Sequence, residues 1–319
     1  MSDRSGRAAG FGFVALAAAL WGTDALFRVG LAVNLPASVI VFAEHVLLVI
    51  LTFPLLLRAL KVTRSFELRD WAAAVVVGAG ASALATVLFT RAFVYGDPNT
   101  PLLLQKLQPL VAAFGAWVLL GERLLPRYLL YLVVALGGAY LITFADPTSV
   151  TARSLGAGEL AVGAACLWGL GTVLGRHLTT KLTTAELTAL RFGIGLVASA
   201  AIVLVDQGSS GYSMPLEARF IPGIIGLTLV PGLIAMLFYY RGLRTTPAAA
   251  ATLGELTFPL TAIILNYLAF DEVMTATQWL GVLLLAGTIT AMGLASRRSP
   301  RALGVDAPSA PAVALADSA

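Results

Sequence analysis

Two stretches of the chain decide its fold: RAFVYGDPNTPLLLQKLQPL at 91–110 and RGLRTTPAAAATLGELTFPL at 241–260. They align at a constant offset of 150 residues. The offset pairs identical residue types in chain order: Arg91 with Arg241, Pro109 with Pro259, Glu122 with Glu272, and Gly137 with Gly287. Earlier in the chain, the tripeptide LWG at 20–22 matches LWG at 167–169. An ordered series of matching residues predicts an internal duplication.

Composition places the duplicated unit in a lipid bilayer. Of the 319 residues, 58% are hydrophobic and 12% are charged, whereas soluble domains carry about 25% charged residues. A helix needs about 20 apolar residues to cross the hydrocarbon core. Such runs fall at 11–31, 36–57, 71–93, 99–119, 128–145, 157–176, 184–205, 220–240, 247–269 and 276–295. We therefore expect an all-α integral membrane protein with ten transmembrane helices.

The number of helices in each copy predicts how the two copies are oriented. Each copy holds five helices, and because five is odd, the second copy enters the bilayer from the opposite side. This is an inverted repeat, an architecture typical of transporters that work by alternating access. Fifteen of the 21 Lys and Arg residues flank the spans on the N-terminal side and four flank the other side. The positive-inside rule then predicts that both termini are cytoplasmic, in a cell membrane.

The predicted organisation follows from these spans. It comprises a cytoplasmic N-terminus at 1–10, a first repeat at 11–145, a linker at 146–156, a second repeat at 157–296 and a disordered cytoplasmic tail at 297–319. Arg4 and Arg7 before the first apolar run also fit a cleaved signal peptide. The length of that run, and the polar residues inside it, favour an uncleaved first span.

The motifs carry a family resemblance. LWG lies near the start of each repeat, Pro109 and Pro259 lie in the fourth span of each, and Glu122 and Glu272 follow those spans. The chain resembles the EamA-type ten-helix permeases of the drug/metabolite transporter superfamily over about residues 11–296. The resemblance implies transport of a small molecule across the cytoplasmic membrane, often export, without naming the substrate.

Polar residues inside the spans are the candidate functional residues, because an ionisable group in mid-span costs about 2.5–3.5 kcal/mol. The candidates for substrate binding are Lys106, Gln105, Gln108, Glu255, Glu44, Asp24, Trp21 and Arg191. The candidates for proton coupling are Glu44, His45, Glu255 and Asp24. Pro109 and Pro259 free a backbone carbonyl one turn earlier, which predicts either a hinge or a simple kink.

Most of these residues also have a purely structural interpretation. Lys106 would pair with Glu44 or Asp24, Arg191 with Glu186 or Glu255, and His45 would form an interhelical hydrogen bond. Asp24 and Arg28 are spaced as an i,i+4 pair, with Arg28 expected as an anchor at the outer rim. Trp21 and Trp168 would belong to aromatic belts at the interface, and Glu122 and Glu272 would cap or pair at helix ends.

These features favour a secondary transporter of a small polar or zwitterionic metabolite such as an amino acid, and the resemblance implies export. Protons are the candidate coupling ion. The alternatives are a structural or sensory membrane protein and, less favoured, efflux of lipophilic drugs. No enzyme motif or ATP-binding loop is present, so we expect no catalysis, cofactor or nucleic-acid partner. One cysteine and two histidines make a metal site unexpected.

Overall fold

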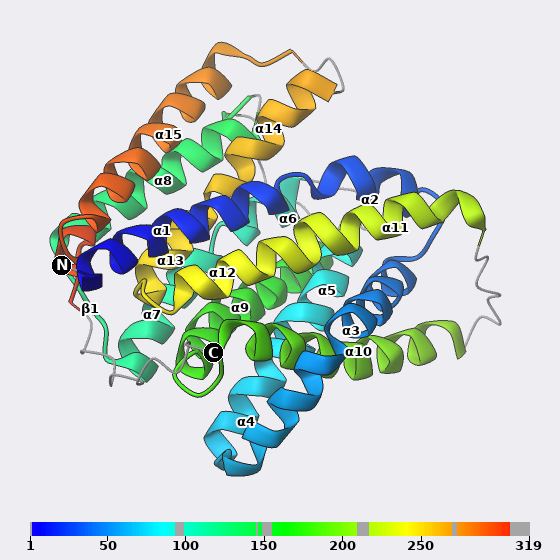
Figure 1. The fold of residues 1–319 in the computed structure, drawn as a ribbon. Coiled ribbons are helices and arrows are strands. Elements are labelled where there is room, and N and C mark those ends of the chain that lie inside the picture. Colours follow the sequence, from blue (N-terminus) through cyan, green and yellow to red (C-terminus); the bar gives the residue numbers. More distant parts are fainter. Residues whose placement is uncertain are drawn as a thin grey trace.

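The molecule is a bundle of long helices (Figure 1). The computed structural model describes residues 2–92, 99–144, 146–148, 155–208, 217–269 and 273–306. Within them, ten helical segments are long and apolar enough to span a membrane: Ala9–Ala32, Ala37–Ser65, Leu68–Ala92, Leu103–Leu120, Pro126–Thr143, Gly156–Leu178, Thr184–Asp206, Ala218–Leu243, Ala248–Leu265 and Ala276–Ser296. This confirms the ten expected spans. The second is longer than predicted, because the helix continues past Arg58 and Lys61.

The spans are built from shorter elements. Those of the first half are α1 (Ser2–Trp21), α2 (Asp24–Ala32), α3 (Ala37–Val62), η1 (Thr63–Ser65), α4 (Leu68–Val75), η2 (Val76–Leu84), α5 (Ala85–Ala92), α6 (Asn99–Gln105), α7 (Gln108–Leu120), β1 (Arg123–Leu124) and α8 (Pro126–Thr143). Those of the second half are α9 (Leu155–Leu178), α10 (Thr184–Gly208), η4 (Ala218–Phe220), α11 (Ile221–Leu227), η5 (Thr228–Ile234), α12 (Ala235–Leu243), α13 (Ala248–Glu255), α14 (Thr257–Ala269), α15 (Ala276–Ser296), η6 (Pro300–Leu303) and β2 (Val305–Asp306).

Departures from regular α-helix recur at corresponding places in the two halves. The third span widens into a π-helical stretch at η2, and the eighth does so at η5. The second of these contains Pro231, which lacks an N–H group and cannot continue the α-helical hydrogen-bond pattern. Such stretches are frequent at functional sites, and both η2 and η5 contribute residues to the cavity described below.

The fourth and ninth spans are each broken near their middle by a proline. Helix α6 ends at Gln105, four residues before Pro109, and α13 ends at Glu255, four residues before Pro259. A proline ring clashes with the carbonyl four residues earlier, which accounts for both positions. The backbone turns through 106–107 and through Leu256 before each helix resumes. The predicted hinge prolines therefore lie at real breaks, whereas their movement stays a prediction.

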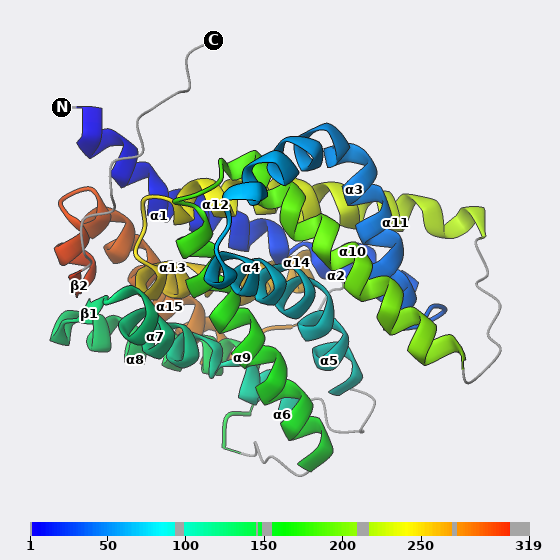
Figure 2. The same cartoon turned by 90° about the horizontal axis from the view of Figure 1, so that it is seen from below.

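The two halves interlock. Helix α1 of the first half packs against α12, α13 and α14 of the second, and α3 packs against α10 (Figures 1 and 2). Helices α8 and α15, the last spans of the two halves, also pack together. Side chains of both halves therefore form the core between them.

The first ten residues of the predicted disordered tail have a defined conformation. Val305 and Asp306 pair as an antiparallel strand with Leu124 and Arg123, and the Val305 side chain is fully buried. Val305 shares a hydrophobic cluster with Phe11 near the other end of the chain. The prediction of disorder is therefore wrong for 297–306, because apolar residues between the polar ones reach the core. The rest of the tail lies outside the described residues.

Glu122 joins the two halves, as a helix cap rather than as a cavity residue. Its carboxylate accepts hydrogen bonds from the backbone N–H groups of Ala248 and Ala249 at 2.7 and 3.0 Å, at the start of α13. Burial raises the pKa of the Glu122 carboxyl, whereas the two N–H donors and the Arg176 guanidinium oppose this shift. A capping role was expected for Glu122. Its repeat partner Glu272 lies outside the described residues.

Neighbouring glycines on α8 provide a test of the packing with α15. A Cβ atom at Gly138 would lie 3.0 Å from the Leu285 backbone nitrogen, whereas one at Gly137 would meet nothing within 4 Å. We expect Gly138→Leu to lower the free energy of unfolding in detergent by about 1–3 kcal/mol, because overpacking separates the helices. Gly137→Leu is the matched control and should change it by less than about 0.5 kcal/mol. Equal losses in both would contradict this packing.

Candidate functional site

A cavity of about 460 Å³ lies among the spans and is lined by residues of both halves. Its size is within the range of small-molecule sites. The lining includes every residue predicted to bind substrate, to couple protons or to act as a hinge: Trp21, Asp24, Glu44, His45, Gln105, Lys106, Gln108, Pro109, Arg191, Glu255 and Pro259. The structure thus brings these residues together, while the role of each stays a prediction.

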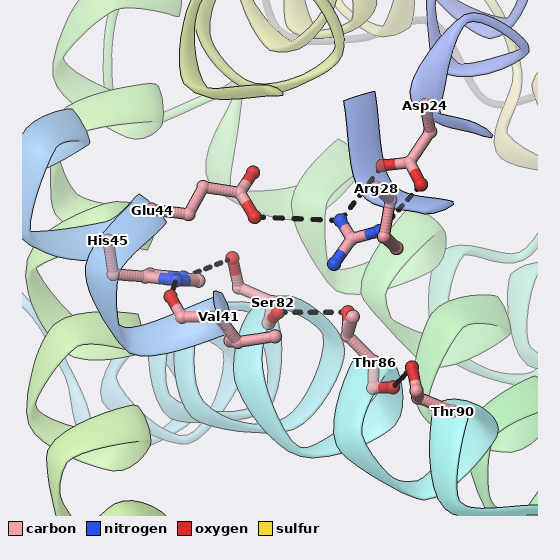
Figure 3. Close-up of polar contacts among 8 residues, drawn as sticks. All are labelled: Asp24, Arg28, Val41, Glu44, His45, Ser82, Thr86 and Thr90. Carbon is pink, nitrogen blue, oxygen red and sulfur yellow. Dashed lines mark hydrogen bonds and ion pairs between the residues drawn. The ribbon is translucent and has the colours of Figure 1, made fainter. Parts of the chain in front are cut away.

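One side of the cavity carries an ion-pair cluster centred on Arg28 (Figure 3). Its guanidinium donates two hydrogen bonds to the Asp24 carboxylate, at 2.5 and 2.8 Å, and lies 3.6 Å from the Glu44 carboxylate. The expected i,i+4 pair of Asp24 and Arg28 is confirmed. The expectation that Arg28 anchors the outer rim is wrong, because its side chain turns inward to neutralise Glu44 as well.

His45 belongs to a second polar network on the cavity wall (Figure 3). Its Nδ1 lies 2.7 Å from the Val41 carbonyl oxygen and its Nε2 3.0 Å from Ser82 Oγ. Since a carbonyl only accepts, Nδ1 carries the proton and Ser82 donates to Nε2, so the neutral imidazole is fully satisfied. Gly195 permits this packing, because a Cβ there would lie 2.5 Å from Nε2.

Arg191 completes this network. It donates to Ser82 Oγ at 3.3 Å and to the Tyr240 hydroxyl at 3.1 Å. The alternative ion pairs are not formed: within the described ranges, no carboxylate lies within 4.0 Å of its guanidinium. Glu186 instead accepts from the backbone N–H and the hydroxyl of Thr183, at the start of α10.

Glu255 lies at the break of the ninth span and accepts three hydrogen bonds from neutral groups. Gln108 Nε2 donates to Oε2 at 2.7 Å, whereas Thr172 Oγ1 and the Tyr239 hydroxyl donate to Oε1 at 2.9 and 2.8 Å. Gln108 belongs to the first half and the other three residues to the second. Thr172 and Tyr239 were not predicted, since a lone Thr or Tyr in an apolar segment gives no distinguishing signal.

Lys106 lies in the turn between α6 and α7. The alternative pairs with Glu44 and Asp24 are not formed, because Arg28 neutralises both. Among the residues the structure describes, it is the only charged side chain of the cavity with neither a hydrogen bond nor an ion pair. The neighbouring Gln105 amide likewise has no hydrogen-bond partner in that part of the chain. The cavity therefore presents an ammonium group without a protein counter-ion.

Aromatic side chains make up much of the remaining wall. They are Trp21, Phe89, Trp168, Phe192, Tyr239 and Phe258. Trp21 packs on Tyr239 with ring centroids 5.1 Å apart, and Phe89 packs on Trp168 at 5.2 Å. The alternative that places Trp21 and Trp168 in interface belts does not hold, because both line the cavity. No group of three or more metal-ligating side chains occurs in the described ranges.

Comparison with known proteins identifies the family. A sequence model of the EamA-like transporter family matches residues 8–144 and again residues 158–294. The chain belongs to the EamA-like transporter family. It is thus an EamA-type member of the drug/metabolite transporter superfamily, and the double match agrees with the duplication read from the sequence.

Individual relatives of this EamA-family protein are also named as transporters. It is 28% identical over 274 residues to the riboflavin transporter ImpX of Fusobacterium nucleatum, which covers 83% of this chain and 91% of that protein. It is 24% identical over 296 residues to the uncharacterized transporter YwfM of Bacillus subtilis, covering 91% and 95%. A solved crystal structure superposes with a TM-score of 0.74 at 19% identity, covering 91% of this chain and 98% of that one.

The ion-pair cluster of the cavity can be tested by stability. Arg28→Gln leaves the carboxylates of Asp24 and Glu44 together without a counter-ion. We expect the free energy of unfolding in detergent to fall by about 1–3 kcal/mol, less than for a fully buried ion pair because the Arg28 and Asp24 side chains are partly exposed. Adding Glu44→Gln to this variant removes one of the two carboxylates and should recover part of the lost free energy of unfolding.

Arg219→Gln is the matched control for Arg28→Gln. Arg219 pairs with Glu217 on the surface, where both side chains are more than half exposed. Exposed pairs contribute little, so this variant should keep the wild-type stability. If Arg28→Gln also left the free energy of unfolding unchanged, the cluster would not stabilise the fold.

Proposed function

We propose that this EamA-family protein is a secondary transporter that exports a small polar or zwitterionic metabolite, such as an amino acid. The observation that carries the proposal is the cavity, which both halves line with charged and aromatic side chains in mid-span. Such groups are expensive in a bilayer unless they serve a solute or satisfy one another. Export, rather than import, rests on the family resemblance alone.

Alternating access is the proposed mechanism. Five spans in each half, with breaks and π-helical stretches at matching positions, support an inverted repeat with both termini in the cytoplasm of a cell membrane. The breaks at Pro109 and Pro259 are then the candidate hinges. A proton is the candidate coupling ion, with Asp24, Glu44, His45 and Glu255 as its possible acceptors.

Lys106 supports a substrate with an anionic group. A cation within a span that lacks a counter-ion is destabilising, and a carboxylate or phosphate on the solute would neutralise it. Of the cavity cations, Arg28 already pairs with two carboxylates, and Arg191 donates to two hydroxyl groups. Lys106 is therefore the proposed anchor, with the Gln105 amide beside it as a further donor.

A flavin is a second candidate substrate. The aromatic wall suits a planar heterocycle, which would stack between side chains such as Trp21 and Trp168. The similarity to a riboflavin transporter points in the same direction. Riboflavin has no charged group at neutral pH and leaves Lys106 without a counter-ion, whereas riboflavin 5′-phosphate provides one. These two compounds therefore form a matched pair.

Transport is tested with the purified full-length chain in proteoliposomes. A panel of amino acids, their amides, riboflavin, riboflavin 5′-phosphate and lipophilic cations is first ranked by the rise in melting temperature, since a ligand stabilises the native state in proportion to occupancy. The best compounds are then assayed for counterflow. Saturable counterflow supports a transporter. If no compound is transported, whether or not some of them raise the melting temperature, the structural or sensory alternative is favoured. Flux of lipophilic cations alone favours drug efflux.

The anchor role of Lys106 predicts a charge-dependent loss. Lys106→Met should weaken binding of the compounds with a carboxylate or phosphate by at least about 30-fold, from a loss of about 2 kcal/mol or more, and leave the analogues without that group unaffected. Lys106→Arg keeps the charge and should bind far better than Lys106→Met. The matched control is Lys61→Met, on the exposed end of α3, which should bind as the wild type does. Equal loss for compounds with and without the carboxylate or phosphate would argue for a structural role.

A further inference from the structure

Glu255 differs from the other carboxylates of the cavity in its partners. Asp24 and Glu44 share the Arg28 guanidinium. Within the described part of the chain, no Lys or Arg nitrogen lies within 4.0 Å of Glu255. Its three hydrogen bonds all come from an amide or a hydroxyl group. Glu255 is thus a carboxylate that gains or loses a proton without breaking an ion pair.

Few other titratable groups face Glu255. On α12, the Tyr239 hydroxyl donates to it, and on α10 the Arg191 charge acts on it from beyond contact distance. The elements α1, α7 and α9 present groups that do not titrate: Trp21, Gln108 and Thr172. Tyr128 of α8 donates to the carbonyl of Ala249, near the other end of α13, and α14 presents Phe258 and Pro259.

His45 is a weaker proton acceptor by geometry. Its Nδ1 already donates to Val41, and its Nε2 already accepts from Ser82, which in turn accepts from Arg191. A second ring proton would face the Ser82 hydroxyl and a nearby guanidinium. The proton would therefore have to displace an existing bond and approach a positive charge.

The hydrogen bond between Gln108 and Glu255 lies where the fourth and ninth spans are broken. Gln108 is the first residue of α7, directly after the break of the fourth span, and Glu255 is the last residue of α13, directly before the break of the ninth. Their 2.7 Å hydrogen bond therefore joins the two broken spans, one from each half. Any change in its strength acts where both spans are already interrupted.

We propose that Glu255 is a proton-binding site and that proton uptake there loosens the hydrogen bond to Gln108. This deepens the proposed function and rests on it. A proton from cavity water binds a carboxylate oxygen, which changes an acceptor-only group into one that also donates. The bonds from Gln108, Thr172 and Tyr239 then lose their charge assistance, which accounts for about half of such a bond's strength. Release of the proton restores them, so the link between the halves follows the protonation state.

The chain contains its own reporter for this reaction. Trp21 packs on Tyr239, whose hydroxyl bonds Glu255, so protonation of the carboxylate alters the surroundings of the indole. We expect the tryptophan emission of the purified full-length protein in detergent to show a one-proton transition with pH. The transition should be absent in Glu255→Gln and in Trp21→Phe. Glu44→Gln should retain it.

The outcomes that overturn the proposal are a wild-type protein without the transition, or a Glu255→Gln variant that keeps it. Because Glu255→Gln could fail to fold, Gln108→Leu provides a second measurement on a chain that retains the carboxylate. Removing a donor that stabilises the anion should move the midpoint to higher pH, and an unchanged midpoint would overturn the role of Gln108. The titration needs no solute, so absence of flux in proteoliposomes would reject the proposed function without deciding this result.

Discussion

A proline cannot donate a backbone hydrogen bond, and its ring excludes the carbonyl four residues before it. This constraint, applied at Pro109 and Pro259, ends α6 at Gln105 and α13 at Glu255. In a bilayer, irregular backbone is tolerated only where it is buried in protein or lines a cavity. The breaks therefore require a polar interior around them, and the side chains next to each break become part of its wall.

The polar interior is shared between the halves because neither half satisfies it alone. Gln108 of the first half donates to Glu255 of the second, and Ser82 of the first accepts from Arg191 of the second. Glu122 caps a helix that begins 126 residues later. Each bond satisfies a group that lipid could not, so the same contacts that hold the halves together also shape the cavity.

The sequence was sufficient to predict the spans and the residues at the cavity. Twenty-residue apolar runs have one stable solution in lipid, a transmembrane helix. Charged residues in mid-span must face the interior, which is why Lys106, Glu255 and Glu44 all line the cavity. The direction of a long side chain near a helix end is not set by spacing, so Arg28 was assigned to the wrong place.

Other features left no pattern to read. Tyr239 and Thr172 occur in runs where such residues are common, and only the fold shows that both reach one carboxylate. The strand at 305–306 is too short for a periodicity to appear, and it forms only because Arg123 and Leu124 offer a free backbone edge. The choice among possible ion pairs also depends on distances that spacing along the chain does not determine.

The interlocking of the halves has a consequence for biosynthesis. Helix α1 leaves the ribosome first, yet its partners α12, α13 and α14 lie more than 200 residues later in the chain and are made long after it. Until then, the first five spans lack the surfaces of the second half that they finally bury against. The nascent first half must therefore have these surfaces covered by the insertion machinery or by another chain. A gene encoding that half alone would need to associate with a second product to give the same interior.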